Sequence, residues 1–306
     1  MTWESYRIGE SPEWVTPYSR GSLEPWIETL DLRLASSKAD EFAHHLDRME
    51  PAEKSRWLWN IGYFATLDAK LAVALSMTRL GLKIASDHQL PIETLYCQSL
   101  LIWVYTRLGF QETARDNARF ADPILEVGTE AERFRHWIRK GSLANLMGDA
   151  KFAQKCLLEA DLKREGRCLA DLQVLEFLRA ETAFTSGEVE RSTELYRDLV
   201  DELPNILAIN FLALAPIRYA RNLLQLKQEE GEILLKQGVL NALSLQQYGA
   251  ARSGLAQLQD FYLRVGRMDD FAMVYAQRRE LDPLYDVKKI ESEATRILAQ
   301  LDFSVA

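Results

Sequence analysis

Four glycines recur along this chain at nearly constant spacing. Gly109, Gly148 and Gly187 are 39 residues apart, and Gly266 follows after 79 residues, close to twice that distance. Each glycine lies between two stretches whose apolar residues recur with the period of an amphipathic helix. A fixed period of this length is typical of proteins built from stacked repeats. The spacing therefore predicts a series of helix-turn-helix pairs, with one glycine in the turn of each pair.

This period predicts six helix pairs between residues 51 and 283. Small or apolar residues recur five and nine residues after the turn glycine, as Ala114 and Ala118 do, and they form one face of the second helix. Leu226 or Lys227 takes the place of the glycine in the fifth pair. Pro216 predicts a kink in the helix before it, because proline removes a backbone hydrogen bond. The pairs are expected at 52–67 with 70–87, 91–108 with 111–127, 129–147 with 150–165, 168–186 with 189–202, 205–226 with 228–245, and 247–265 with 268–281.

The two ends of the chain differ from these pairs. Within residues 1–50, the stretch up to about residue 21 is rich in Pro and Gly and is predicted to form an irregular arm. Two short helices are expected after it, at 23–36 and 38–49. This region is expected to pack on the first repeat. A last helix at about 284–301, within 284–306, is expected to cap the last pair, because a terminal repeat otherwise exposes its apolar face. The fold class predicted is all-α.

Composition limits the classes of function. Hydrophobic residues make up 47% of the 306 residues, which argues against disorder, and the net charge of −8 argues against direct nucleic-acid binding. We found no secretory signal and no apolar stretch long enough to span a membrane, so we expect a cytoplasmic protein without membrane insertion. The three cysteines, Cys97, Cys156 and Cys168, are expected to be reduced and packed in the core.

The helix pairs resemble the tetratricopeptide repeat family over about residues 52–283. With Gly148 as the turn residue, Trp137 lies at the family's tryptophan, Gly141 at its small mid-helix position and Ala153 at the alanine of its second helix. The period of about 39 residues exceeds the family's usual repeat of about 34 and resembles the long repeats of bacterial regulatory and signalling proteins. The resemblance implies a right-handed superhelical solenoid whose first helices line a concave groove.

The register implied by this resemblance predicts an aromatic groove that also contains Arg and Asn. Such a mixture suits peptide binding, since aromatic rings supply contact area and arginine fixes a carboxylate. Arg135 and Arg139 match two basic positions of the family's clamp for peptide carboxylates, although the first two repeats lack its Lys and Asn. The alternative is that both are surface arginines paired to carboxylates such as Glu132 or Glu181. The predicted groove residues are Arg56, Trp59, Asn60, Tyr63, Tyr96, Trp103, Arg135, Arg139, Asn145 and Glu181.

No motif of a known enzyme class occurs in the sequence. His44 and His45 follow Asp40 and Glu41 by one helical turn, but two ligands do not make a metal site, and we expect neither metal nor cofactor. The favoured function is a non-enzymatic scaffold or adaptor that binds a peptide or helix of a partner protein. The alternatives are a regulatory sensor of a small peptide or ligand, a structural subunit of a larger assembly, or an enzyme with an unrecognised helical site. Homo-oligomerisation stays possible.

Overall fold

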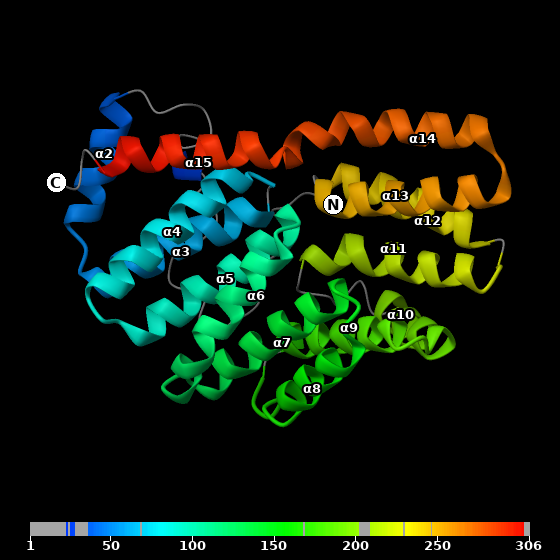
Figure 1. The fold of residues 1–306 in the computed structure, drawn as a ribbon, viewed down its shortest axis with the longest axis horizontal. Helices are drawn as coiled ribbons and strands as arrows, with labels where there is room; N and C mark the ends of the chain where they lie inside the picture. The colour runs from blue at the N-terminus through cyan, green and yellow to red at the C-terminus, as the bar shows by residue number, and fades with distance from the viewer. Residues whose placement is uncertain are drawn as a thin grey trace. The chain divides into compact units, whose positions relative to one another are not determined.

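The described part of the chain is all-α. The computed structural model describes residues 23, 25–27, 36–67, 69–167, 169–201, 209–228, 230–245 and 247–302. Within these ranges the chain forms helices and turns and contains no strand, which confirms the predicted fold class (Figure 1). None of the helices in these ranges is both long and apolar enough to cross a membrane. The predicted arm at 1–21 and most of the predicted helix at 23–36 lie outside the described residues.

The chain divides into two compact units. The first, which we call the terminal unit, contains the described residues up to Arg133 and those from Leu284 onwards. The second, the central unit, contains Phe134–Pro283.

The terminal unit begins with helices that pack on their neighbours in chain order. They are α2 (Ser36–Asp47), α3 (Pro51–Leu67), α4 (Leu71–Asp87), α5 (Pro91–Leu108), α6 (Gln111–Ala121) and the 3₁₀-helix η2 (Asp122–Glu126). The second helix of the second predicted pair, α6, was expected at 111–127, but its α-helical part ends at Ala121. The next turn contains Pro123, which cannot donate the backbone hydrogen bond of an α-helix, and the chain continues as η2.

The core of the terminal unit is aromatic at its N-terminal end. Trp57 is 1% exposed and packs edge-on against Trp26, with their ring centroids 5.9 Å apart. His45 of α2 stacks on the same Trp26 at 5.5 Å and lies 5.0 Å from the Trp57 ring of α3, so this histidine contributes to the packing of α2 on α3. Cys97 is also buried, and burial raises the pKa of its thiol to about 12.

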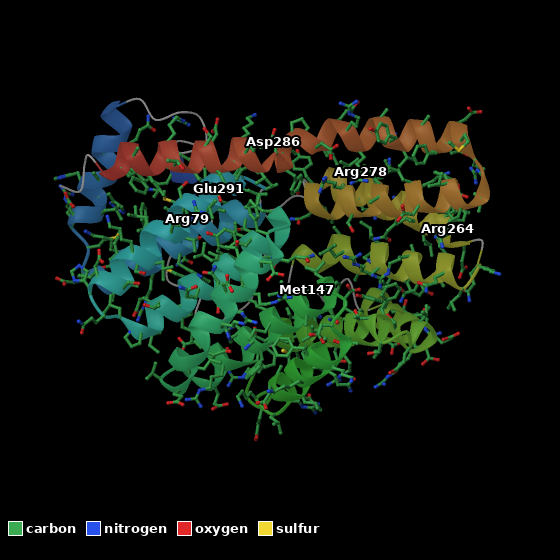
Figure 2. The ribbon with its side chains drawn as sticks, viewed as in Figure 1. Arg79, Met147, Arg264, Arg278, Asp286 and Glu291 are labelled. Atoms are coloured by element: carbon green, nitrogen blue, oxygen red, sulfur yellow. The ribbon has the colours of Figure 1, made fainter. Side chains whose placement is uncertain are left out.

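The last helix of the chain lies in this same unit. After the 3₁₀-helix η4 (Asp282–Tyr285), α15 (Val287–Asp302) packs against α4 and α2. Arg79 of α4 lies beside Glu291 of α15 (Figure 2) and donates two hydrogen bonds to its carboxylate, at 2.9 and 3.0 Å. It donates two more to the Tyr105 hydroxyl oxygen, at 3.2 and 2.9 Å. The helix that we expected to cap the last pair is therefore fixed to the first pair by a two-point ion pair.

The central unit continues the same order of packing. It contains α7 (Glu130–Leu146) from Phe134 onwards, α8 (Ala150–Asp161), α9 (Leu169–Thr185), α10 (Val189–Asp201), α11 (Ile209–Gln225), α12 (Glu230–Ser244), α13 (Tyr248–Val265) and α14 (Met268–Leu281). From α8 on, each helix packs on the next, and the first helices α9, α11 and α13 also touch in sequence. The second helix of the third pair, predicted to extend to residue 165, ends at Asp161, and Gly166 with φ +70° lies in the turn that follows.

The turn glycines have the conformation that their spacing predicts. Gly109, Gly148, Gly187 and Gly266 have φ values of 80°, 71°, 84° and 74°, in the left-handed region that glycine adopts at little cost. At the fifth turn Lys227 has φ 60°, so a residue with a side chain takes the same conformation there. The two helices of the fifth pair are thus joined by the same backbone geometry even though the glycine is missing.

Candidate binding faces on the first helices

The predicted groove residues fall on the first helices of both units. Six of them, Arg56, Trp59, Asn60, Tyr63, Tyr96 and Trp103, lie on α3 and α5 of the terminal unit. The other four, Arg135, Arg139, Asn145 and Glu181, lie on α7 and α9 of the central unit. They therefore form two sites, one in each unit.

The site of the terminal unit is a group of stacked rings, Trp59, Tyr63, Tyr96 and Trp103, which we call the aromatic face. Trp59 and Tyr63 are one turn apart on α3, and their rings stack at 5.5 Å with an interplanar angle of 17°. Tyr96 of α5 lies 5.5 Å from Trp59, and Trp103 of α5 lies 5.8 Å from Tyr63. The four rings thus join two adjacent first helices.

The rings of the aromatic face differ in their exposure. Trp59 is 3% exposed and belongs to the core, whereas Tyr63, Tyr96 and Trp103 are half-buried. Half-buried rings in fixed positions combine apolar area with little remaining rotamer freedom. These three side chains are the part of the aromatic face that a partner can contact.

The two polar residues predicted beside these rings are occupied within the protein. Asn60 is fully buried, and its Nδ2 donates to the carbonyl oxygen of Arg56. Arg56 forms an ion pair with Glu93 of α5, with 2.6 Å between Nη2 and Oε1. Both residues contribute to the packing of α3 and α5.

Arg107, which the sequence analysis did not select, supports the aromatic face from the end of α5. Its guanidinium lies 4.7 Å from the centre of the Trp103 ring, and Nη1 donates to the carbonyl oxygen of Thr66 at the C-terminal end of α3. Burial lowers the pKa of Arg107, and the nearby Tyr285 and Tyr63 oppose this effect. A cation near a helix C-terminus is favourable, and its position in the last turn of α5 was the available signal.

The site of the central unit consists of polar contacts between α7, α9 and α11, and we call its residues Arg135, Asn145, Glu181, Arg218 and Arg221 the charged face. Arg135 of α7 binds Asp171 of α9 with 2.9 Å between Nη2 and Oδ2, and only 14% and 10% of the two side chains are exposed. The carboxylate paired with Arg135 is thus Asp171 rather than Glu132 or Glu181. Asn145 Nδ2 donates to the Thr182 hydroxyl at 3.2 Å. Arg139 is half-buried on α7.

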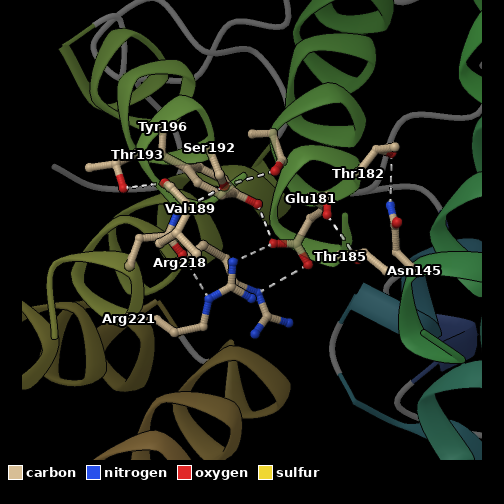
Figure 3. A network of polar contacts seen from close by, with 12 residues as sticks. Asn145, Glu181, Thr182, Thr185, Val189, Ser192, Thr193, Tyr196, Arg218 and Arg221 are labelled. Atoms are coloured by element: carbon tan, nitrogen blue, oxygen red, sulfur yellow. Dashed lines mark hydrogen bonds and ion pairs between the residues drawn. The ribbon is translucent and has the colours of Figure 1, made fainter. Parts of the chain in front are cut away.

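Glu181 is the centre of the charged face (Figure 3). Its carboxylate accepts hydrogen bonds from the Tyr196 hydroxyl and from Arg221 Nη2, the latter at 3.0 Å, and Arg218 Nε lies 3.6 Å away. Arg221 is held by two further contacts, since its guanidinium lies 3.4 Å over the Phe184 ring and Nε donates to Asn222. The network ties α9 and α10 to α11.

The charges of this network fix its protonation. Burial alone raises the pKa of Glu181, but Arg218, Arg221 and the Tyr196 hydroxyl outweigh burial and lower it. Burial and the Glu181 charge raise the pKa of Tyr196, so this hydroxyl stays protonated and donates a hydrogen bond to Glu181. Sequence analysis missed Arg218 and Arg221 because the fifth pair was given no groove positions. The signal that could have found them is their i,i+3 spacing on α11, which is the first helix of the pair that follows the pair of Glu181.

In the ranges that the structure describes, no group of three or more His, Cys, Asp and Glu side chains could hold a metal ion. Comparison of the chain with protein-family models gives no matching family, and comparison with curated proteins gives no matching relative. The two faces therefore have to be interpreted from their own chemistry.

Proposed function

We propose that this protein is a non-enzymatic scaffold or adaptor that binds a peptide or helix of a partner protein on its first helices. In this proposal the helix pairs form a right-handed solenoid of the long tetratricopeptide type. The observation that carries the proposal is the aromatic face, where Tyr63, Tyr96 and Trp103 are half-buried on two adjacent helices.

Preorganisation supports this assignment. Tyr63 contacts both Trp59 and Trp103, and Arg107 lies over the Trp103 ring, so the rings are positioned before any partner arrives. A surface that is already ordered loses less side-chain entropy on binding. Tyrosine and tryptophan are also the residue types that most often dominate binding energy at interfaces.

The proposal is tested by affinity capture with the full chain as bait, followed by mass spectrometry. Captured proteins are then tested against a double variant, Tyr63→Ala with Trp103→Ala. The matched control is Tyr275→Ala, which removes an exposed tyrosine from α14. The proposal predicts that the double variant loses the partner while the control retains it, with helical content unchanged in both. Equal capture by all three proteins would contradict it.

A structural subunit of a larger assembly is the second candidate, and one observation favours it. Apolar side chains are strongly exposed on α12 and α14 of the central unit, with Ile233 at 71%, Leu240 at 60% and Met273 at 50%. Ile233 and Leu240 are seven residues apart on α12 and therefore share one side of this helix, as apolar residues at an interface do. The assembly candidate predicts a defined oligomer by light scattering that Ile233→Ser with Leu240→Ser disrupts, whereas the peptide-binding proposal predicts no change in mass.

A further inference from the structure

We propose that Arg218 on α11 forms a subsite of the central unit for a single carboxylate group of a partner protein or peptide. The inference rests on the proposed function and gives the partner a chemical feature. The subsite lies on the fifth helix pair, at residues that the sequence analysis did not select.

Arg218 has hydrogen-bonding capacity that the protein does not use. Its buried Nε faces Glu181 Oε2 at 3.6 Å, beyond hydrogen-bond distance, and within the described residues neither terminal nitrogen, Nη1 or Nη2, makes a hydrogen bond. Among the described residues Glu181 is also the one ion-pair partner of Arg218. Buried donors without acceptors are rare in native proteins and indicate a missing water, ion or ligand.

The charge of the network is also unbalanced. Glu181 contributes one negative charge, and Arg218 and Arg221 contribute two positive charges. Oε1 of Glu181 already accepts from both Tyr196 and Arg221. Within the described ranges, no second acidic side chain pairs with either arginine, so the network has an excess of one positive charge.

The two arginines differ in their freedom to bind a ligand. Arg221 is fixed by Glu181, Asn222 and the Phe184 ring. Arg218 has 18% of its side chain exposed, and Figure 3 shows its terminal nitrogens on the side of the guanidinium away from Glu181. A guanidinium presents a planar fork of donors that fits a carboxylate with two parallel hydrogen bonds. Arg218 is therefore the binding member and Arg221 the positioning member.

One excess positive charge selects a monoanion. A carboxylate neutralises the network, whereas a phosphate monoester has a charge of about −1.5 to −2 near neutral pH. The additional negative charge would lie close to Glu181 and would be repelled by it. The subsite is thus predicted to prefer a C-terminal carboxylate or an Asp or Glu side chain over a phosphate group.

The test uses the full chain and the resonances of the arginine Nε–Hε groups in NMR spectra. The protein is titrated with sodium acetate, and in parallel with inorganic phosphate, at an ionic strength held constant with sodium chloride. We expect a saturable shift of the Arg218 resonance with acetate and weaker binding of phosphate. In the Arg218→Gln variant, acetate binding is measured from the resonance of Arg221. We expect this variant to bind acetate more weakly by roughly tenfold or more. The matched control, Arg191→Gln on the exposed side of α10, should bind acetate like the wild type.

Two results would overturn the subsite. One is an acetate shift that does not saturate or that is the same in Arg218→Gln, and the other is tighter binding of phosphate than of acetate. If Arg218→Gln does not fold, Arg218→Lys keeps the charge but loses the fork, and it should also weaken acetate binding. A Gly-Gly-Ala peptide with a free C-terminus and an acetyl-Gly-Glu-Gly amide then distinguish the two carboxylate sources.

The outcome is separable from that of the proposed function. Loss of acetate binding with capture still dependent on Tyr63 and Trp103 overturns the subsite alone. If acetate binding is saturable but the double variant Tyr63→Ala with Trp103→Ala captures the partner as well as the wild type does, the peptide-binding function alone is overturned.

Discussion

The aromatic face of the terminal unit and the charged face of the central unit lie on equivalent helices but are built differently. On α3 and α5, three of the four rings are half-buried and offer contact area. On α7, α9 and α11, Arg135 and Glu181 are paired with residues of the next repeat and are mostly buried. Successive helix pairs thus carry half-buried rings in one unit and, in the other, an internal network that fixes neighbouring pairs to each other.

The largest expected effect comes from breaking the charged face at its centre. Glu181→Gln leaves Arg218 and Arg221 as two mostly buried cations without their carboxylate, and removing one partner of a buried ion pair costs about 3–5 kcal/mol. Urea unfolding followed by hydrogen exchange should locate this loss in α9–α11. Glu188→Gln, which breaks an exposed i,i+3 pair with Arg191, is the control and should cost less than about 1 kcal/mol. A cost for Glu181→Gln as small as that of the control would refute the role of the network.

Acid is expected to have the next largest effect, because the central unit depends on ionised carboxylates. Burial alone raises the pKa of Glu232, but hydrogen bonds from Lys236, Arg267 and Tyr262 lower it from 4.5 to about 2. A pKa that is lower in the folded than in the unfolded state stabilises the fold above the unfolded value. This stability should be fully present above pH 4.5 and be lost progressively as the pH falls towards 2.

Hydrogen exchange of α12 and α13 as a function of pH measures this loss. The variant Glu232→Gln should be less stable than the wild type at neutral pH and should lose less protection on acidification. The same acid dependence in the wild type and in Glu232→Gln would show that other groups control it.

Arg107 is the corresponding test for the aromatic face. The variant Arg107→Gln removes the cation over Trp103 and the donor to the Thr66 carbonyl, and leaving a buried polar group unsatisfied costs about 1–3 kcal/mol. Tryptophan fluorescence and thermal unfolding should both change, whereas Arg115→Gln on the neighbouring α6 should change neither. An unchanged melting temperature would mean that the aromatic face is positioned without Arg107.

The smallest expected effect concerns the backbone of the repeats. Lys227 adopts the left-handed conformation found at the four turn glycines, and this conformation costs a residue with a Cβ atom about 1–2 kcal/mol. Lys227→Gly should therefore raise the free energy of unfolding, by at most about 1 kcal/mol after the added entropy of the unfolded chain is subtracted. Gly187→Ala is the matched reverse change and should destabilise the protein. A destabilised Lys227→Gly variant would contradict this account of the fifth turn.

The helix order could be predicted from the sequence because its causes are local. A glycine with positive φ and an amphipathic period act within one turn of the chain, and they gave most helix ends to within a few residues. The helix in 23–36 lies mostly outside the described residues, and the early ends of α6 and α8 follow from Pro123 and from the turn at Gly166, whose local effects were underestimated.

The contacts between distant residues could not be predicted in the same way. The pairing of Arg79 with Glu291 joins positions separated by 212 residues, and no local pattern specifies it. Arg135 was recognised as a groove position, but its partner Asp171 depends on how α9 lies beside α7. Arg107 was missed in part because its acceptor, the Thr66 carbonyl, lies on another helix, and Arg218 was missed because the fifth pair was given no groove positions.

The most direct test of the central claim is site-specific photo-crosslinking of the captured partner. Benzoylphenylalanine is introduced in place of Tyr96 on the aromatic face or, in a separate protein, in place of Tyr275 on α14. If the aromatic face binds the partner, we expect cross-links to the partner from position 96 and none from position 275. Cross-links from position 275 alone would contradict binding at the aromatic face and would indicate an interface on α12 and α14 instead.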